Sequence, residues 1–151
     1  MQSYLFYWKE YWNENRRVPR KKPDWRSRRL YAVEALAMCG GDVWVVISGG
    51  KKDPDGWRLL EHLSIRVQSA KEVKKSEGQL RVVADRKSYR SFQPARQSDA
   101  AAMLRKLSFK SGKRIKASGK RIGMTLQSPR QLALRDEAIL RDYAQGCERA
   151  F

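Results

Sequence analysis

The sequence predicts a small α+β domain in which a mostly antiparallel sheet curls on itself or closes into a barrel, with two or three flanking helices. Three observations favour this class. One apolar stretch is bounded by glycine pairs, other short segments alternate between apolar and polar residues, and a few longer segments carry a helical apolar stripe. At 151 residues the chain has the length of a single domain, so residues 1–151 are expected to share one fold.

The apolar stretch lies between the glycine pairs at 40–41 and 49–50 and is rich in Val, Ile and Trp. Its composition predicts a strand buried on both faces, and it is too short to span a membrane. Further strands are expected over residues 3–8, 57–67 and 79–84. In the first of these, alternation places Tyr4, Phe6 and Trp8 on one face and Leu5 and Tyr7 on the other.

Helices are expected at three places. Residues 27–38 carry an apolar stripe and Ser27 is the expected N-cap, residues 100–107 follow the capping pair Ser98-Asp99, and Ser128-Pro129 is expected to open a C-terminal helix. Residues 51–56 predict a turn, and the polar, lysine-rich residues 69–78 predict a loop.

The charge balance indicates the class of partner. The chain has 33 Lys and Arg against 16 Asp and Glu, a formal net charge of +17. Self-repulsion of that size is easiest to explain if a polyanion neutralises it, and nucleic acid, DNA or RNA, is the expected partner. A membrane surface fits less well, because no long amphipathic helix with a basic face is evident.

Two basic segments are the expected contacts to phosphates. Residues 9–26 mix prolines, aromatics and cations and predict a basic loop, and residues 105–121 lie inside a stretch, 100–135, that contains no acidic residue. Within that stretch residues 111–115, Ser-Gly-Lys-Arg-Ile, recur at 118–122, which predicts two basic turns flanking a hairpin or loop. The cations expected to contact phosphates are Arg16, Arg17, Arg20, Arg28, Arg29, Lys113, Arg114, Lys120 and Arg121.

The cations at 26, 28 and 29 crowd the expected start of the first helix, where the helix dipole disfavours them. A docked phosphate and a solvated basic turn explain them equally well. The tryptophans at 12, 25 and 57 lie in or beside polar segments, so they are expected to be exposed rings that stack on a base. The alternative is that they cover the edges of a small core.

Two alternative functions stay open. Asp55, Glu72 and Lys74 have the order of a metal-dependent nuclease signature, in which the acids hold Mg²⁺ and the lysine assists a water. A basic structural or assembly protein that contacts RNA or an acidic partner would also carry such a charge. His62, the only histidine, is expected to be structural.

The sequence indicates neither a cofactor nor a metal. Cys39 and Cys147 are far apart and neither belongs to a CxxC motif, which argues against a disulfide framework and a zinc site. The first residues lack a basic region ahead of an apolar core, so no secretory signal is expected and the protein is predicted to be cytoplasmic.

The order of the first elements resembles a known group. An aromatic strand at 4–8, a helix, Gly41-Asp42-Val43-Trp44 leading into an apolar strand, and a further strand ending at 65–67 are similar to the start of PUA-like barrels, particularly EVE-type domains, over residues 3–67. The resemblance implies binding of RNA or DNA and an aromatic cage for a modified or flipped base, as in bacterial restriction systems. It makes Trp8, Trp25, Trp44 and Ser48 candidates for the pocket wall.

Overall fold

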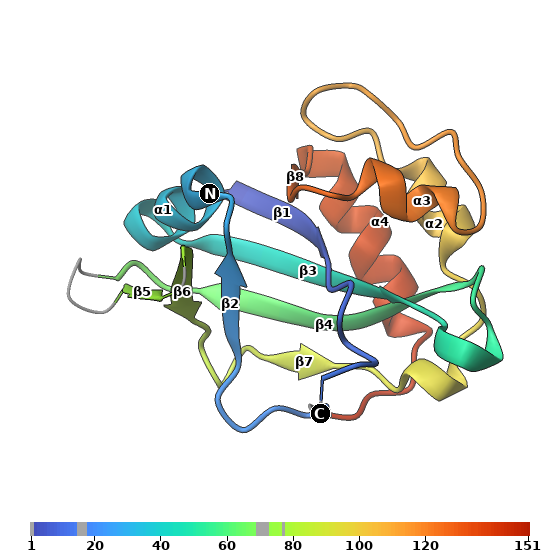
Figure 1. Ribbon diagram of the computed structural model, residues 1–151, viewed down its shortest axis with the longest axis horizontal. Helices are drawn as coiled ribbons and strands as arrows, with labels where there is room; N and C mark the ends of the chain where they lie inside the picture. Colours follow the sequence, from blue (N-terminus) through green and yellow to red (C-terminus); the bar gives the residue numbers. More distant parts are fainter. Residues whose placement is uncertain (1, 15–17, 69–72, 77) are drawn as a thin grey trace.

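The structure is a computed structural model, and it describes residues 2–14, 18–68, 73–76 and 78–151. The described elements form three layers (Figure 1): a small sheet with one helix, a larger sheet in the middle, and a group of helices against its other face. The α+β class expected from the sequence is confirmed.

The larger sheet has five strands in the order β7-β4-β3-β1-β8, of which β1 and β3 run parallel and the other neighbours antiparallel. The smaller sheet has three antiparallel strands in the order β2-β6-β5. The strands of the larger sheet are β1 (Gln2–Tyr7), β3 (Gly41–Ser48), β4 (Trp57–Ile65), β7 (Arg90–Ser91) and β8 (Arg130–Gln131), and those of the smaller sheet are β2 (Asp24–Ser27), β5 (Lys74–Ser76) and β6 (Gln79–Val83).

Four α-helices are described, one beside the smaller sheet and three on the far side of the larger sheet. They are α1 (Leu30–Cys39), α2 (Ala101–Lys106), α3 (Arg121–Thr125) and α4 (Leu134–Gln145), and two short 3₁₀ turns lie at η1 (Gly50–Lys52) and η2 (Pro94–Arg96).

Strand β3 separates two apolar cores, as the sequence predicts. Val43, Val45 and Ile47 pack toward α1 and the smaller sheet, whereas Trp44 and Val46 pack toward α2, α3 and α4. All five side chains are buried. The alternation expected for β1 is also confirmed, because Tyr4 and Phe6 join the first core and Leu5 and Tyr7 the second.

The expected barrel closure is wrong. Strand β2 pairs with β6 in the smaller sheet and does not extend the larger one. The outer strands of the larger sheet, β7 and β8, are only two residues long. Among the described residues, β-type backbone pairing between the two sheets is limited to one isolated bridge, Ile65 to Ala84, so the larger sheet remains an open, mixed sheet. Edge strands this short offer too few backbone groups to close a barrel.

Three boundaries differ from the sequence-based expectation. Ser27 ends β2 and does not cap α1, because it pairs with Leu80 and its hydroxyl oxygen accepts a hydrogen bond from the Arg29 backbone N–H at 3.0 Å. Ser128-Pro129 leads into β8, and the last helix begins at Leu134. Part of the lysine-rich stretch expected as a loop forms β5, where the hairpin partner β6 overrides the local preference.

Candidate nucleic-acid interface

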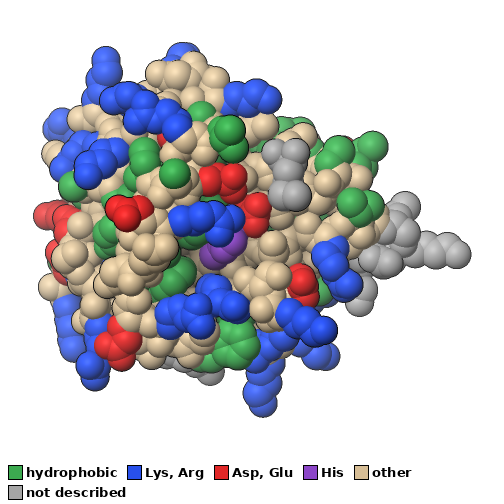
Figure 2. Space-filling model, turned by 180° about the vertical axis from the view of Figure 1, so that it is seen from behind, with side chains coloured by type: hydrophobic (Ala, Val, Ile, Leu, Met, Phe, Trp, Pro, Cys, Tyr) green, Lys and Arg blue, Asp and Glu red, His purple; other side chains and the backbone are tan. Residues whose placement is uncertain are grey.

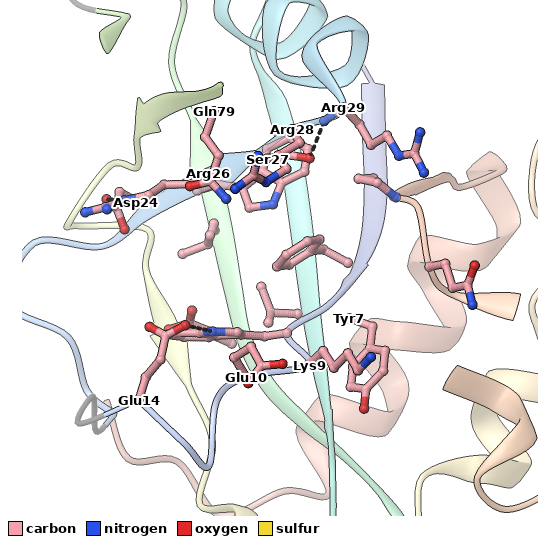
Figure 3. Close-up of a pocket in the computed structure, with 18 of the residues that line it drawn as sticks. Tyr7, Lys9, Glu10, Glu14, Asp24, Arg26, Ser27, Arg28, Arg29 and Gln79 are labelled. Carbon is pink, nitrogen blue, oxygen red and sulfur yellow. Dashed lines mark hydrogen bonds and ion pairs between the residues drawn. The ribbon is translucent and has the colours of Figure 1, made fainter. Parts of the chain in front are cut away.

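A cavity of about 760 Å³ lies between the C-terminal end of β1, strand β2, the β2–α1 turn and strand β4 (Figure 3). That volume is within the range of small-molecule sites. Its wall combines aromatic, acidic and basic side chains, among them Phe6, Trp8, Lys9, Glu10, Arg20, Asp24, Trp25, Arg26, Ser27, Arg28, Arg29, Glu61, Gln79 and Gln127. Since these residues come from segments far apart in the chain, the cavity exists only in the folded protein.

Aromatic rings, among them those of Phe6, Trp8 and Trp25, belong to the apolar part of the wall. Phe6 and Trp25 meet edge to face with ring centroids 5.7 Å apart, and Tyr4 stacks behind Trp25 at 6.2 Å. Trp8 follows the end of β1 and packs edge to face on Tyr11 at 5.2 Å. Phe6 and Trp8 are half-buried, so parts of both rings remain accessible from the cavity. Flat apolar surfaces of this kind suit a planar ring.

A break in strand register turns Glu61 toward this cavity. The pairing of β3 with β4 shifts between Val45 and Val46, so that Val45 opposes Glu61 and Val46 opposes Leu59, leaving Leu60 without a partner. An extra residue in one strand turns the following side chain to the other face. Leu60 and Glu61 therefore both face the first core, whereas His62 stacks on Trp44 on the other side of the sheet.

Glu61 is fully buried and its charge is neutralised by Arg20. The guanidinium donates to both carboxylate oxygens of Glu61, through Nε at 3.1 Å and Nη2 at 2.7 Å, and to Asp24 Oδ1 at 2.7 Å. The Tyr89 hydroxyl donates to Glu61 Oε2 at 2.6 Å. Charge-assisted bonds of this density hold the segment that follows Pro19 against the sheet.

Asp24, another acid of the wall, also has hydrogen bonds to both of its carboxylate oxygens. Besides Arg20, it accepts hydrogen bonds from Arg26 at 3.3 Å and from Arg81. Burial alone would raise the pKa of Asp24, but the hydrogen bond from Arg81 and the charge of Arg20 lower it below the ordinary value. For Arg20, burial acts to lower the pKa, and the charge of Glu61 raises it above the ordinary value. Both groups therefore stay ionised at neutral pH.

The rim of the cavity has two chemically different sides. Figure 3 shows Arg26, Arg28 and Arg29 on one side with Ser27 and Gln79, and Lys9, Glu10 and Glu14 with Tyr7 on the other. Arg28 and Arg29 are exposed, and within the described part of the chain neither guanidinium has an ion-pair partner. These two cations are available for an anionic group at the mouth of the cavity.

Residues 100–135, which contain no acidic residue and are called the acid-free segment, are joined to the cavity wall through β8. Gln127 and Pro129 belong to the wall, and β8 begins at the next residue and pairs with β1. The Lys110 backbone N–H donates to the carbonyl of Gln131 at 2.9 Å, and the Arg130 guanidinium lies 3.6 Å from the ring centre of Phe109. The acid-free segment therefore contributes to the cavity wall just before β8.

The six residues expected to bind a base do not gather at one place. Trp8 and Trp25 line the cavity, but Trp25 belongs to β2 and is 2% exposed, so the expectation of an exposed loop ring is wrong for it. Trp12 is 46% exposed and its indole donates to the carbonyl of Ser48 at 2.9 Å, away from the cavity wall.

Trp44 and Trp57 lie in the core on the opposite face of the larger sheet, so neither can join the same pocket as Trp8. Trp57 is 2% exposed, with its indole donating to the carbonyl of Gly119 at 3.0 Å, and the expectation of an exposed ring is wrong for it as well. The turn before it is polar, but Trp57 itself opens a strand whose alternation points it inward.

The nine cations expected to contact phosphates fall into three groups: one that forms buried ion pairs, two that lie outside the described residues, and six that are exposed. Arg20 is taken up by the buried ion pairs, so the expectation that it grips phosphate is wrong. Arg16 and Arg17 lie outside the described residues. Exposed cations remain at the cavity rim and on the acid-free segment, namely Arg28, Arg29, Lys113, Arg114, Lys120 and Arg121.

The opposite face of the molecule carries the single histidine (Figure 2). His62 Nε2 lies 2.8 Å from Asp42 Oδ1, and the Ser64 hydroxyl donates to the same oxygen at 3.2 Å. The imidazole stacks on Trp44 with centroids 4.0 Å apart. Because the carboxylate stands between the serine and the histidine, this is not a serine nucleophile activated by a histidine.

Of the three residues of the nuclease alternative, the structure describes the side chain of Asp55 alone. Asp55 is exposed in the turn before β4, Glu72 lies outside the described residues, and the side chain of Lys74 is not described. Across the described ranges, no group of three or more His, Cys, Asp or Glu side chains could hold a metal ion. A search of the same residues for a helix long and apolar enough to cross a membrane also finds none.

Sequence reasoning missed Phe6, Asp24 and Glu61 as parts of the cavity. A signal for Glu61 was present, because it interrupts the apolar residues 59–63, and a carboxylate inside a buried strand needs a partner. The register shift that aims it, however, depends on pairing between strands and leaves no mark in the local sequence.

Comparison with protein-family models, curated proteins and solved structures finds no match to this chain. The resemblance to PUA-like and EVE-type domains therefore depends on the order of elements and the short motif at 41–44, and it remains a prediction.

Proposed function

We propose that this protein is a nucleic-acid-binding module that takes one base of a strand into the cavity between β1 and β2. The observation that carries the proposal is the combination of Phe6, Trp8 and the exposed arginines Arg28 and Arg29 at one opening. Accessible aromatic surface supplies stacking for any base, and cations at the mouth contact the flanking phosphates.

The charge distribution supports a strand rather than an isolated nucleotide. The +17 charge is far more than one phosphate requires, and the surface of the acid-free segment, which carries exposed cations, reaches the cavity wall at Gln127 and Pro129. A strand whose phosphates follow this surface would release counterions at each contact. Modified-base reading in a defence or restriction setting is the sharper form of the proposal, and it derives from the resemblance to EVE-type domains.

The test is a binding titration of the whole chain with labelled single-stranded and double-stranded DNA and RNA, at two or more salt concentrations. Affinity is expected to fall steeply with salt, with a log–log slope of about 0.7 per phosphate contact on a single strand. Mg²⁺ is included so that cleavage would be detected. If no nucleic acid binds in a salt-dependent way, the proposal is wrong and the basic surface belongs to a protein interface.

Rim variants test the phosphate contacts. Arg28→Ala and Arg29→Ala are each expected to reduce the magnitude of the salt slope by about 0.7, because each removes one cation from the mouth of the cavity. Lys87→Ala is the matched control, since Lys87 is exposed and lies outside the cavity lining. An equal loss in all three variants would show that binding depends on total charge and not on this rim.

Aromatic variants test base stacking. Trp8→Ala is expected to weaken binding of a single strand by roughly 5- to 100-fold, the usual loss for one stacked base. Trp12→Ala is the control, because Trp12 is the more exposed ring but lies outside the cavity lining. If Trp12→Ala weakens binding and Trp8→Ala does not, the base stacks elsewhere.

A further inference from the structure

Two β2 side chains that line the cavity, Trp25 and Ser27, carry hydrogen-bond donors for which the described residues supply no acceptor. The indole N–H of Trp25 is buried and has no hydrogen-bond partner within the described part of the chain. Ser27 uses its hydroxyl oxygen to accept from the Arg29 backbone N–H, and no described group accepts the hydroxyl hydrogen. Unpartnered buried donors are uncommon, so a ligand is a natural source of the missing acceptor.

The two buried carboxylates of the same wall, Asp24 and Glu61, are already occupied. Both carboxylate oxygens of Asp24 and both of Glu61 accept hydrogen bonds from arginines, and Glu61 also accepts from Tyr89. A ligand group that donates hydrogen bonds would find these four carboxylate oxygens already occupied. A ligand group that accepts them would meet Trp25 and Ser27.

We infer that the cavity selects a base whose inward edge carries carbonyl oxygens, with the pyrimidine-2,4-diones thymine and uracil as the class that fits. This inference rests on the proposed function. In such a base the carbonyl oxygens at positions 2 and 4 accept hydrogen bonds, whereas cytosine carries an amino group at position 4. An amino group facing the Trp25 indole would place a donor against a donor, and the indole would stay unsatisfied in the complex.

The test uses three labelled single strands that differ at one central position: thymine, 5-methylcytosine or an abasic site. Thymine and 5-methylcytosine have the same methyl group and nearly the same shape, so they differ in the polar edge. The whole chain is expected to bind the thymine strand roughly three- to tenfold more tightly than the 5-methylcytosine strand, the usual effect of one hydrogen bond between neutral groups. The abasic strand is expected to bind most weakly.

Trp25→Phe removes the N–H and keeps an aromatic ring, and it is expected to bring the thymine and 5-methylcytosine affinities together. Trp44→Phe is the matched control, because the Trp44 indole is equally buried and also unpartnered but lies on the other face of the sheet. Circular dichroism and thermal unfolding confirm that both variants are folded. The comparison of thymine with 5-methylcytosine in the unmodified protein tests the inference even if a variant does not fold.

The outcomes separate the two proposals. Equal or tighter binding of 5-methylcytosine in the unmodified protein overturns the inference about the carbonyl edge but leaves the base pocket intact, provided that the abasic strand binds more weakly. The inference is also overturned if Trp25→Phe keeps the thymine preference. If the abasic strand binds as tightly as the other two, no base enters the cavity and the proposed function itself is wrong.

Discussion

Replacing Arg20 by Met should destabilise the fold by on the order of 3–5 kcal/mol, the typical loss when one partner of a buried ion pair is removed. The substitution removes two hydrogen bonds to Glu61 and two to Asp24, one to its carboxylate and one to its backbone carbonyl. It leaves Glu61, which is 0% exposed, with Tyr89 as its remaining hydrogen-bond donor among the described residues. Because the Arg20 side chain is only 11% exposed, solvent screens these contacts little.

The assay is urea unfolding at neutral pH, followed by circular dichroism and tryptophan fluorescence. The double variant Arg20→Met, Glu61→Leu removes both charges and is expected to be clearly more stable than Arg20→Met alone, since an apolar pair can replace a buried ion pair. A loss below about 1 kcal/mol in Arg20→Met, or a double variant that is less stable than the single one, would refute the assignment of Arg20 to a structural ion pair.

Two further predictions concern stability. The lowered pKa values of Asp24 and Asp42 stabilise the folded state at neutral pH, and this stability is lost as the pH falls below the ordinary aspartate pKa of about 3.9 and through the folded values. Thermal unfolding between pH 7 and pH 2 should show that Asp24→Asn loses less stability in acid than the unmodified protein does. An unchanged pH profile would contradict the assignment. Asp136→Ala should destabilise the fold by roughly 3 kcal/mol or more, because the buried carboxylate accepts hydrogen bonds from the backbone N–H groups of Ser108, Phe109 and Ala133. Urea unfolding measures the loss, and Asp142→Ala is the control because Asp142 is exposed. Equal stability of the two variants would contradict this role of Asp136.

The Asp136 contacts also explain how the acid-free segment is held. Residues 100–135 carry no acid of their own, yet the first acid after them fixes the chain at 108–109 and at 133. The exposed cations of this segment are thus displayed on an anchored loop. An anchored loop loses less conformational freedom when it binds than an unanchored one does.

Local pattern was enough to predict the four longest strands, β1, β3, β4 and β6, and part of the core. The apolar stretch at 41–48 is β3, and the alternation in β1 places Tyr4 and Leu5 on opposite faces as expected. These features depend on side-chain period alone, which the sequence displays directly. The net charge likewise follows from composition and needs no fold.

The cavity, by contrast, was decided by tertiary structure. Trp25 reads as part of a polar, proline-containing loop, but pairing with Val82 in the smaller sheet makes it a strand residue and buries it against Phe6. In the sequence, nothing distinguishes Arg20 from the many other cations, but the bulge in β4 turns Glu61 toward it. Strand pairing between distant segments sets both positions, and the free energy of burying a charge or a ring depends on neighbours that local sequence does not specify.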